Sequence, residues 1–206
     1  MSEIKDGILV DPLVTINLIP QIERDDLNLQ KIEAIVIHQT FSPTAESTFG
    51  AWKTGRKNPK TGQIGYYGAH FVVDTGTVTT INKKSYSGID GKIYQTARVN
   101  KRCLHVGAVR NKIYPVNENS IGIEVVSMYD TPNKTYPPPT GAQLMSTARL
   151  IKMLMNSIPT IASLDKVYAH GVISYKDEKQ SEGVSTLIGI KTLAILSRMT
   201  PFLPLF

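Results

Sequence analysis

Strand-like apolar runs alternate with helical patterns along this chain, and this alternation constrains its fold more than any other feature. The run Ile35-Val36-Ile37-His38 is short, continuous and rich in β-branched residues, which is typical of a buried strand. Strands are predicted for residues 31–38, 69–74, 77–81, 92–95, 120–126 and 167–170. Helices are predicted for residues 42–55, 140–159 and 184–198. Strands interleaved with helices indicate an α/β domain in which helices flank a mixed central β-sheet.

Two of the predicted helices begin with an N-terminal signal. Pro43 follows Ser42, and proline is favoured at the first helical position because its φ angle already suits a helix. Thr140 is followed three residues later by Gln143, which is the spacing of a capping box. Within that second helix, an apolar stripe is formed by Leu144, Ala148, Ile151 and either Leu154 or Met155.

Length and composition indicate a single globular domain. The chain has 206 residues, of which 41% are hydrophobic and 19% charged, and this length allows a core without covalent support. Residues 1–30 mix apolar triplets with acidic clusters and are predicted to form an N-terminal arm packed on the domain, which spans residues 31–206. The single cysteine, Cys103, excludes an internal disulfide and a CxxC metal cluster.

Neither a membrane span nor a secretory signal is expected. No apolar stretch approaches 18 residues, the length at which a transmembrane helix becomes a candidate, so membrane insertion is not predicted. The first six residues, Met1 to Asp6, lack the apolar core of a signal peptide. We therefore expect the protein to be made in the cytoplasm.

The basic charge balance favours contact with polyanions but does not identify one. Lysine and arginine number 23 against 17 acidic residues, a net charge of +6, which favours nucleic acid, teichoic acid or lipopolysaccharide. The basic residues are scattered, with no dense run and little aromatic interleaving. A solvated basic surface is the simpler interpretation, and nucleic-acid binding is the weakest of the functional hypotheses.

Two histidines have the spacing of a metal site. His38 ends one predicted strand and His170 ends another, and a polar stretch follows at residues 176–183. Two imidazoles and one further oxygen or sulfur ligand are a recurrent catalytic zinc site, in which the fourth position stays open for water. A single histidine at a strand end is more often structural, so the predicted metal site depends on the two histidines together. This pattern indicates a metallohydrolase.

Three other kinds of side chain are candidates for the chemistry. Glu124 shares its strand face with Gly122 and Val126, and a half-buried carboxylate there suits a general base because desolvation raises its pKa. The alternative is a glutamate that faces solvent. Lys179 would normally be solvated, but near a metal its charge could stabilise an oxyanion. His70 and His105 belong either to the core or to the wall of a cleft.

Six segments occur in the order found in one known family. They are His38-Gln39-Thr40, residues 68–73, residues 90–95, His105-Val106-Gly107, residues 119–124 and the stretch from His170 to Lys179. Over residues 31–198 the chain resembles the zinc-dependent N-acetylmuramoyl-L-alanine amidases of the amidase-2 type, which are related to T7 lysozyme and to the peptidoglycan recognition proteins.

The resemblance implies a fold and a set of roles. It implies a cleft over a mixed sheet, with Zn²⁺ held by His38 and His170. Glu124 would be the catalytic base and Lys179 would polarise the scissile carbonyl group. His70 and His105 are expected to bind substrate.

The chain departs from the family pattern at the third metal ligand. The usual Asp or Cys is replaced by Ser181, and serine there accompanies loss of amidase activity in recognition-type relatives. Glu182 is the next residue, and its carboxylate is an anion at neutral pH, unlike the serine hydroxyl. We expect Glu182 to complete the site, with Ser181 as the alternative. A second departure is an insertion at Thr75–Ile89.

The preferred functional hypothesis is a peptidoglycan hydrolase that uses zinc-activated water to cleave the amide between N-acetylmuramic acid and L-alanine. The alternative is a peptidoglycan-binding module without metal. Without a signal peptide, such a hydrolase would reach the cell wall or periplasm through phage lysis, as an endolysin, or through contact-dependent delivery, as an antibacterial toxin with an immunity protein as partner. The third possibility is that the protein is a cytoplasmic recycling enzyme.

Overall fold

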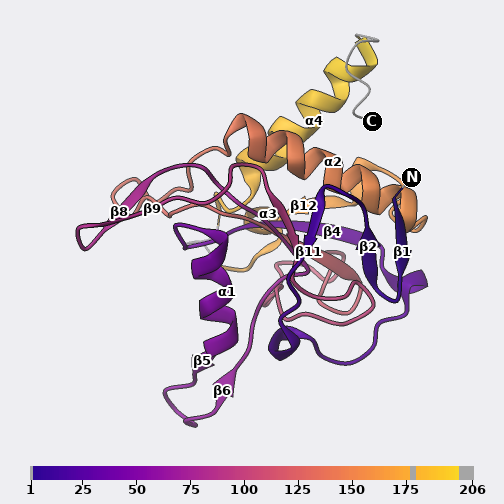
Figure 1. The fold of residues 1–206 in the computed structure, drawn as a ribbon. Helices are drawn as coiled ribbons and strands as arrows, with labels where there is room; N and C mark the ends of the chain where they lie inside the picture. The colour runs from indigo at the N-terminus through magenta and orange to yellow at the C-terminus, as the bar shows by residue number, and fades with distance from the viewer. Residues whose placement is uncertain (1, 177–179, 200–206) are drawn as a thin grey trace.

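The computed structural model describes residues 2–176 and 180–199, and its centre is one mixed β-sheet (Figure 1). Within the described residues this sheet has six strands in the order β12-β4-β11-β7-β10-β3. The strands are β3 (Val14–Ile16), β4 (Ala34–Gln39), β7 (Phe71–Val73), β10 (Ile93–Gln95), β11 (Ser120–Val125) and β12 (Val167–Ala169). The four strands from β12 to β7 are parallel, and β10 runs antiparallel to β7. The predicted α/β fold with a mixed sheet is confirmed.

Helices lie on both faces of the sheet (Figure 1). The helices are α1 (Ala45–Thr54), α2 (Gly141–Ser157), α3 (His170–Ile173) and α4 (Val184–Met199), with short 3-10 turns η1 (Pro20–Ile22), η2 (Leu29–Lys31) and η3 (Leu164–Lys166). Ile35 and Ile37 of β4 pack in one apolar cluster with Ile151 of α2. Because side chains alternate along a strand, Val36 and His38 point to the opposite face, where α1 and α3 lie.

The predicted capping box of α2 is present. The Thr140 hydroxyl accepts a hydrogen bond from the Gln143 backbone, and the Gln143 side chain accepts one from the Thr140 backbone. The side-chain amide of Gln143 also donates to the carbonyl of Val126, at the end of β11. The cap therefore fixes both the start of α2 and its position on the sheet.

Several predicted boundaries were wrong by a few residues. α1 begins at Ala45 rather than at Pro43, because the side chain of Thr44, not Ser42, caps the helix through the backbone N–H of Ser47. β12 ends at Ala169, and His170 is the first residue of the short helix α3 rather than the last of a strand. Both differences are of the one or two residues by which helix and strand ends commonly vary.

Among the residues that the structure describes, three two-stranded hairpins lie outside the central sheet (Figure 1). They are β1 (Glu3–Lys5) with β2 (Ile8–Val10), β5 (Arg56–Lys57) with β6 (Ile64–Gly65), and β8 (Thr79–Ile81) with β9 (Lys84–Tyr86). The second follows α1 directly, and the third is formed by the insertion at residues 75–89. The insertion therefore extends the molecule without adding a strand to the main sheet.

The N-terminal segment is part of the central sheet. β3 pairs in parallel with β10, and the Gln95 side chain accepts from the backbone of Leu9 and donates to the carbonyl of Gly7. Leu9 is fully buried in the main core.

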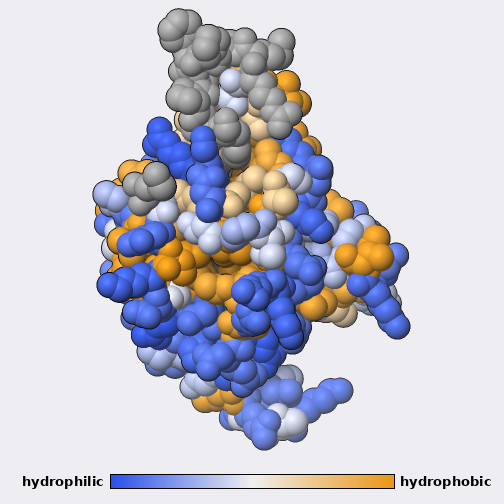
Figure 2. Space-filling view, turned by 90° about the vertical axis from the view of Figure 1, so that its right-hand side faces the viewer, coloured by the Kyte–Doolittle hydropathy of each residue, from blue (hydrophilic) through white to orange (hydrophobic). Residues whose placement is uncertain are grey.

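None of the described helices is long and apolar enough to cross a membrane. The face shown in Figure 2 is covered mainly by hydrophilic side chains, with smaller apolar areas between them.

The position of α1 depends on the buried carboxylate of Asp74, immediately after β7. One oxygen accepts from the backbone N–H groups of Ala45 and Thr75, and the other accepts from that of Ile89. A single side chain thus joins the first turn of α1 to the sheet and to the end of the insertion.

Asp74→Ala is expected to lower the free energy of unfolding by roughly 3 kcal/mol. Each buried backbone N–H group that is left without an acceptor costs about 1–3 kcal/mol. Urea denaturation would measure this loss. Asp90→Ala is the matched control, because Asp90 accepts an exposed hydrogen bond from Thr140, and its cost should stay under about 1 kcal/mol. Equal losses in the two variants would contradict the assigned role of Asp74.

Candidate functional site

The parallel pairing of β4 and β11 places the first two candidate residues side by side. In the register of the two strands, Glu124 lies opposite His38. Both residues lie on the sheet face opposite the α2 core, which receives Ile37 and Ile123. His38 is buried, whereas Glu124 is half-buried and lines the cleft. A carboxylate and an imidazole therefore meet near the carboxyl ends of two parallel strands, where α/β folds commonly bind ligands.

His170 reaches the same place from the other neighbour of β4. Ala169, the last residue of β12, pairs with Ile37, so His170 emerges at the same edge of the sheet as His38. The two imidazole rings lie 4.4 Å apart between centroids. His38 and Glu124 thus come from the adjacent strands β4 and β11, and His170 directly follows the neighbouring strand β12.

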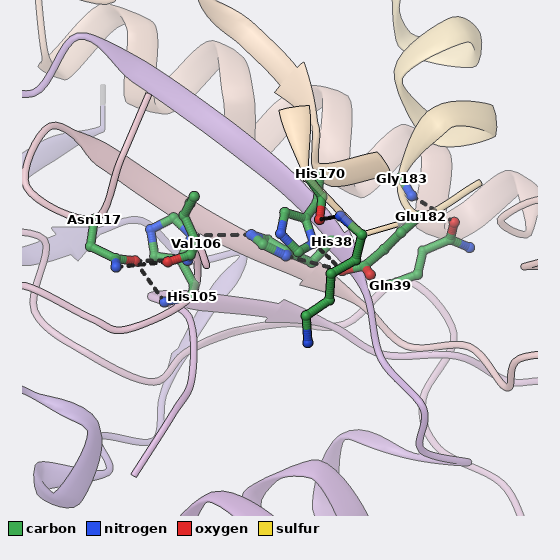
Figure 3. Close-up of polar contacts among 10 residues, drawn as sticks. His38, Gln39, His105, Val106, Asn117, His170, Glu182 and Gly183 are labelled. Atoms are coloured by element: carbon green, nitrogen blue, oxygen red, sulfur yellow. Dashed lines mark hydrogen bonds and ion pairs between the residues drawn. The ribbon is translucent and has the colours of Figure 1, made fainter. Parts of the chain in front are cut away.

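A tight turn brings Glu182 against both imidazoles (Figure 3). The Glu182 carbonyl accepts from the backbone N–H of Gly171, and the Gly183 N–H donates to the side-chain oxygen of Gln39. Gly183 has a φ of 76°, and a Cβ atom there would lie 2.3 Å from the carbonyl oxygen of Ile37. Glycine at 183 is therefore what allows this segment to approach β4 closely.

Two imidazole nitrogens face one carboxylate oxygen. The Nδ1 atoms of His38 and His170 lie 3.1 and 2.9 Å from Oε1 of Glu182. Glu182 is 1% exposed. Burial alone would raise the pKa of this carboxyl group, but the hydrogen bonds to His170 and His38 hold it well below its ordinary value. The carboxylate is accordingly an anion between two imidazoles.

The donor set fits a divalent metal. Ligand atoms of His38, His170 and Glu182 all lie within 4.8 Å of one another. Two imidazoles and a carboxylate are an established zinc set, and ligands at about 2.0–2.1 Å from a tetrahedral centre lie about 3.3 Å apart. The separations of 2.9 and 3.1 Å are close to that spacing. Ser181 makes a different contact, because its hydroxyl accepts from the Tyr136 backbone N–H.

The three side chains lie at the floor of a cleft of about 430 Å³. Trp52 and Tyr67 contribute to its walls, and Glu124 lines the floor beside the cluster. A smaller pocket of about 160 Å³ also borders Trp52, Glu124 and Glu182 and adds Phe41 to the lining. The hollow therefore combines polar groups with aromatic rings, which suits a ligand that has both polar and apolar parts.

His105 contacts the far side of the His38 ring. Its Nδ1 atom lies 3.0 Å from Nε2 of His38 (Figure 3). Asn117 holds the backbone here, because its side-chain oxygen accepts from the N–H groups of His105 and Val106 and its amide donates to the Val106 carbonyl. Burial of the ring and the neighbouring imidazoles lower the pKa of His105 well below its usual value.

His70 lies behind this layer rather than in the cleft. It is fully buried, its Nδ1 accepts from the Gly122 N–H, and its Nε2 lies 2.9 Å from the Lys101 carbonyl. Burial lowers the pKa of His70 to about 4, so the ring is neutral. Its role in substrate binding stays a prediction, and the observed contacts are those of a residue that supports the sheet.

Other outcomes at the site are mixed. Lys179 lies outside the described residues. Sequence reasoning missed Trp52, Tyr67 and Asn117 as cleft residues, because none belongs to a strand end or a ligand-type spacing. Gln39 was only part of a quoted motif, yet its amide donates to the Pro137 carbonyl while its oxygen binds Gly183. In the sequence, the position of Gln39 directly after His38 was the one feature that indicated a role at the site.

Comparison with solved structures places the chain in a known fold. AmpD, solved as a selenomethionine derivative, is 18% identical with a TM-score of 0.55, covering 91% of this chain and 98% of that one. A mutant endolysin from Bacillus subtilis is 22% identical with a TM-score of 0.52, covering 86% and 97%. AmpDh3 from Pseudomonas aeruginosa, in complex with an anhydromuramic pentapeptide, is 21% identical with a TM-score of 0.51 over 69% of this chain. The chain spans about half of AmpDh3, 52% of its length.

At these identities the structural matches show a common fold. A comparison with curated protein sequences gave no match. The family model described as N-acetylmuramoyl-L-alanine amidase, in contrast, matches residues 28–184. This match covers most of the chain and includes every candidate residue discussed above. The chain therefore belongs to the N-acetylmuramoyl-L-alanine amidase family of the amidase-2 type.

Proposed function

We propose that this protein is a zinc-dependent peptidoglycan hydrolase that cleaves the amide between the lactyl group of N-acetylmuramic acid and L-alanine. Family membership supports peptidoglycan amidase activity. The observation that carries the specific proposal is the convergence of His38, His170 and Glu182 at the floor of the cleft.

His38, His170 and Glu182 would hold the zinc ion. When bound, zinc acidifies water and polarises carbonyl groups. His38 and His170 each have a nitrogen facing the Glu182 carboxylate, so a cation that replaced the two hydrogens between them would keep the buried carboxylate paired. Burying charged groups costs free energy, and a module that only binds peptidoglycan does not need such a cluster. The cluster therefore favours catalysis over recognition alone.

Glu124 is placed to move protons. Hydrolysis forms a bond between water oxygen and the carbonyl carbon, breaks the carbon–nitrogen bond and delivers a proton to the departing nitrogen. A Glu124 carboxylate oxygen would accept the proton from water and pass it to the amine of L-alanine. Glu124 lies opposite His38 in the strand register, so it is next to the cluster of His38, His170 and Glu182 but is not one of its members. Lys179 would stabilise charge on the carbonyl oxygen.

The aromatic walls fit a muropeptide. Trp52 and Tyr67 line the cleft of about 430 Å³, and aromatic rings there could pack against sugar rings and peptide. AmpDh3, which shares the fold, has been solved with an anhydromuramic pentapeptide. Peptidoglycan is accordingly the proposed partner. Delivery by phage lysis, or by a contact-dependent system with an immunity protein, remains a prediction.

The first test concerns the metal. Purified protein should retain stoichiometric zinc in equilibrium dialysis, and mass analysis of muropeptides should show amide cleavage that a chelator abolishes. His38→Ala should lose the zinc because the cluster then keeps one imidazole. Zinc-free wild-type protein that still binds muropeptides would favour the binding module.

The second test separates the two residues at the unusual ending. Glu182→Ala should lose both metal and activity, because two imidazoles alone hold zinc weakly. Ser181→Ala is the matched control, since it removes the acceptor of the Tyr136 N–H and should keep the metal. The reverse pattern would make Ser181 the ligand.

The third test addresses Glu124. Glu124→Gln preserves the shape of the side chain but cannot accept a proton, so turnover should fall on the order of a hundredfold or more, the scale of general base catalysis. The variant should retain zinc and unfold at the same denaturant concentration as wild type. Near-normal turnover would assign Glu124 a structural role.

A further inference from the structure

One short segment of the chain carries positive charge without any negative charge. Residues 47–73 contain no aspartate or glutamate, but they include Lys53, Arg56, Lys57 and Lys60. The net charge of the whole chain is +6. Although basic residues are scattered over the chain as a whole, an excess of four positive charges therefore belongs to this segment.

The fold places these four side chains on one projection. Lys53 lies in the last turn of α1, Arg56 and Lys57 form β5, and Lys60 lies in the turn that leads to β6. The hairpin of β5 and β6 extends away from the sheet and is the lowest part of the molecule in Figures 1 and 2, where its surface is largely hydrophilic. All four side chains are exposed. Within the part of the chain that the structure describes, none of them forms an ion pair.

The turn of this hairpin is ordered by its own hydrogen bonds. The side-chain oxygen of Asn58 accepts from the backbone N–H of Lys60 at 2.8 Å, and the Asn58 N–H donates to the carbonyl of Gln63. Gly62 has a φ of 74°, and a Cβ atom there would lie 3.9 Å from Cε of Lys57. The side chain of Lys57 therefore lies close to the turn that carries Lys60, so two cations are held at the same end of the hairpin.

The base of the hairpin adjoins the cleft. Trp52 precedes the hairpin and Tyr67 follows it, and both line the cleft. A Cβ atom at Gly65 would lie 2.8 Å from the ring of Tyr67, so this cleft residue packs directly on β6. The guanidinium group of Arg24 donates to the Tyr66 carbonyl at 3.1 Å and adds a fifth cation at the base. A ligand held by the hairpin would therefore lie beside the rim of the cleft.

The chemistry of the hairpin fits an anion with closely spaced charges. A phosphodiester polymer has a negative charge in every repeat, and lysine and arginine bind such polymers with release of counterions. Residues 53–63 contain no aromatic and no large apolar side chain. Single-stranded nucleic acid is bound by stacking on aromatic rings, and a membrane surface by inserted apolar side chains. The composition thus favours a polymer that is recognised by charge alone.

We propose that the hairpin of β5 and β6 binds the anionic phosphodiester polymers that are attached to peptidoglycan in cell walls, and so keeps the cleft close to its substrate. Tethering of this kind raises the effective concentration of the second ligand. The inference rests on the proposed function, because the cleft is taken to act on peptidoglycan. Binding by the hairpin, however, is measurable whether or not the protein cleaves an amide.

The test measures co-sedimentation of the purified protein with two preparations of one cell wall, in the presence of a chelator. The first preparation retains its phosphodiester polymers, and the second has lost them by extraction with hydrofluoric acid. The test variant replaces three basic residues of the hairpin: Arg56→Gln, Lys57→Gln and Lys60→Gln. Wild type should bind the intact wall roughly tenfold or more tightly than the extracted wall, and the test variant should lose this preference.

Two further variants serve as controls. One removes the same charge from exposed positions on η2, η3 and α4: Lys31→Gln, Lys166→Gln and Lys191→Gln. It should bind the intact wall within about threefold of wild type, because charges far from a contact are screened by salt. The other keeps the charge of the hairpin: Arg56→Lys, Lys57→Arg and Lys60→Arg. It should retain the preference for the intact wall.

Several results would overturn the proposal. They are equal binding of wild type to the two walls, an equal loss in the two glutamine variants, a lost preference in the charge-conserving variant, or tighter binding of duplex DNA or anionic lipid vesicles than of the purified wall polymer. Cleavage of a soluble muropeptide, assayed without chelator, should be unchanged in the hairpin glutamine variant. A wild-type protein that cleaves no muropeptide would contradict the proposed function, and co-sedimentation would still decide the role of the hairpin.

Discussion

The parallel pairing of β4 with β11 on one side and β12 on the other is the constraint on which the site depends. The register aligns Glu124 with His38 and Ala169 with Ile37. Because parallel strands end at the same edge, three groups that are far apart in the chain meet there. The apolar face of the same strands packs on α2, so the core that stabilises the fold also fixes the relative positions of the candidate catalytic side chains.

Charge is tolerated at this edge because each group has a partner. Glu182 is buried, but two imidazoles face its carboxylate, and His38 is supported from behind by His105. Burial of an unpaired carboxylate would cost several kcal/mol.

Much of this arrangement was predictable from local sequence. The capping pair of Thr140 and Gln143 and the strand that contains Glu124 follow from spacing and β-branched composition, and both are present. The exact end of β12 and start of α1 were not predicted, and for α1 the Ser42-Pro43 signal obscured the local cap by Thr44. The roles of Asn117 and Gln39 were likewise hidden, since each depends on a backbone segment distant in sequence.

The sequence by itself determined the α/β class, the main core face and the identity of the chemical groups, because these depend on periodicity and residue type. Only the tertiary structure decided which of two adjacent residues joins the imidazoles. Residue type favoured Glu182 over Ser181 but could not place either, whereas the turn at Gly183 and its bond to Gln39 direct the Glu182 carboxylate to His38 and His170, and Ser181 binds the Tyr136 backbone. The contact of His105 with His38 is of the same kind, because a hydrogen bond between residues 67 positions apart exists only after the strands have paired.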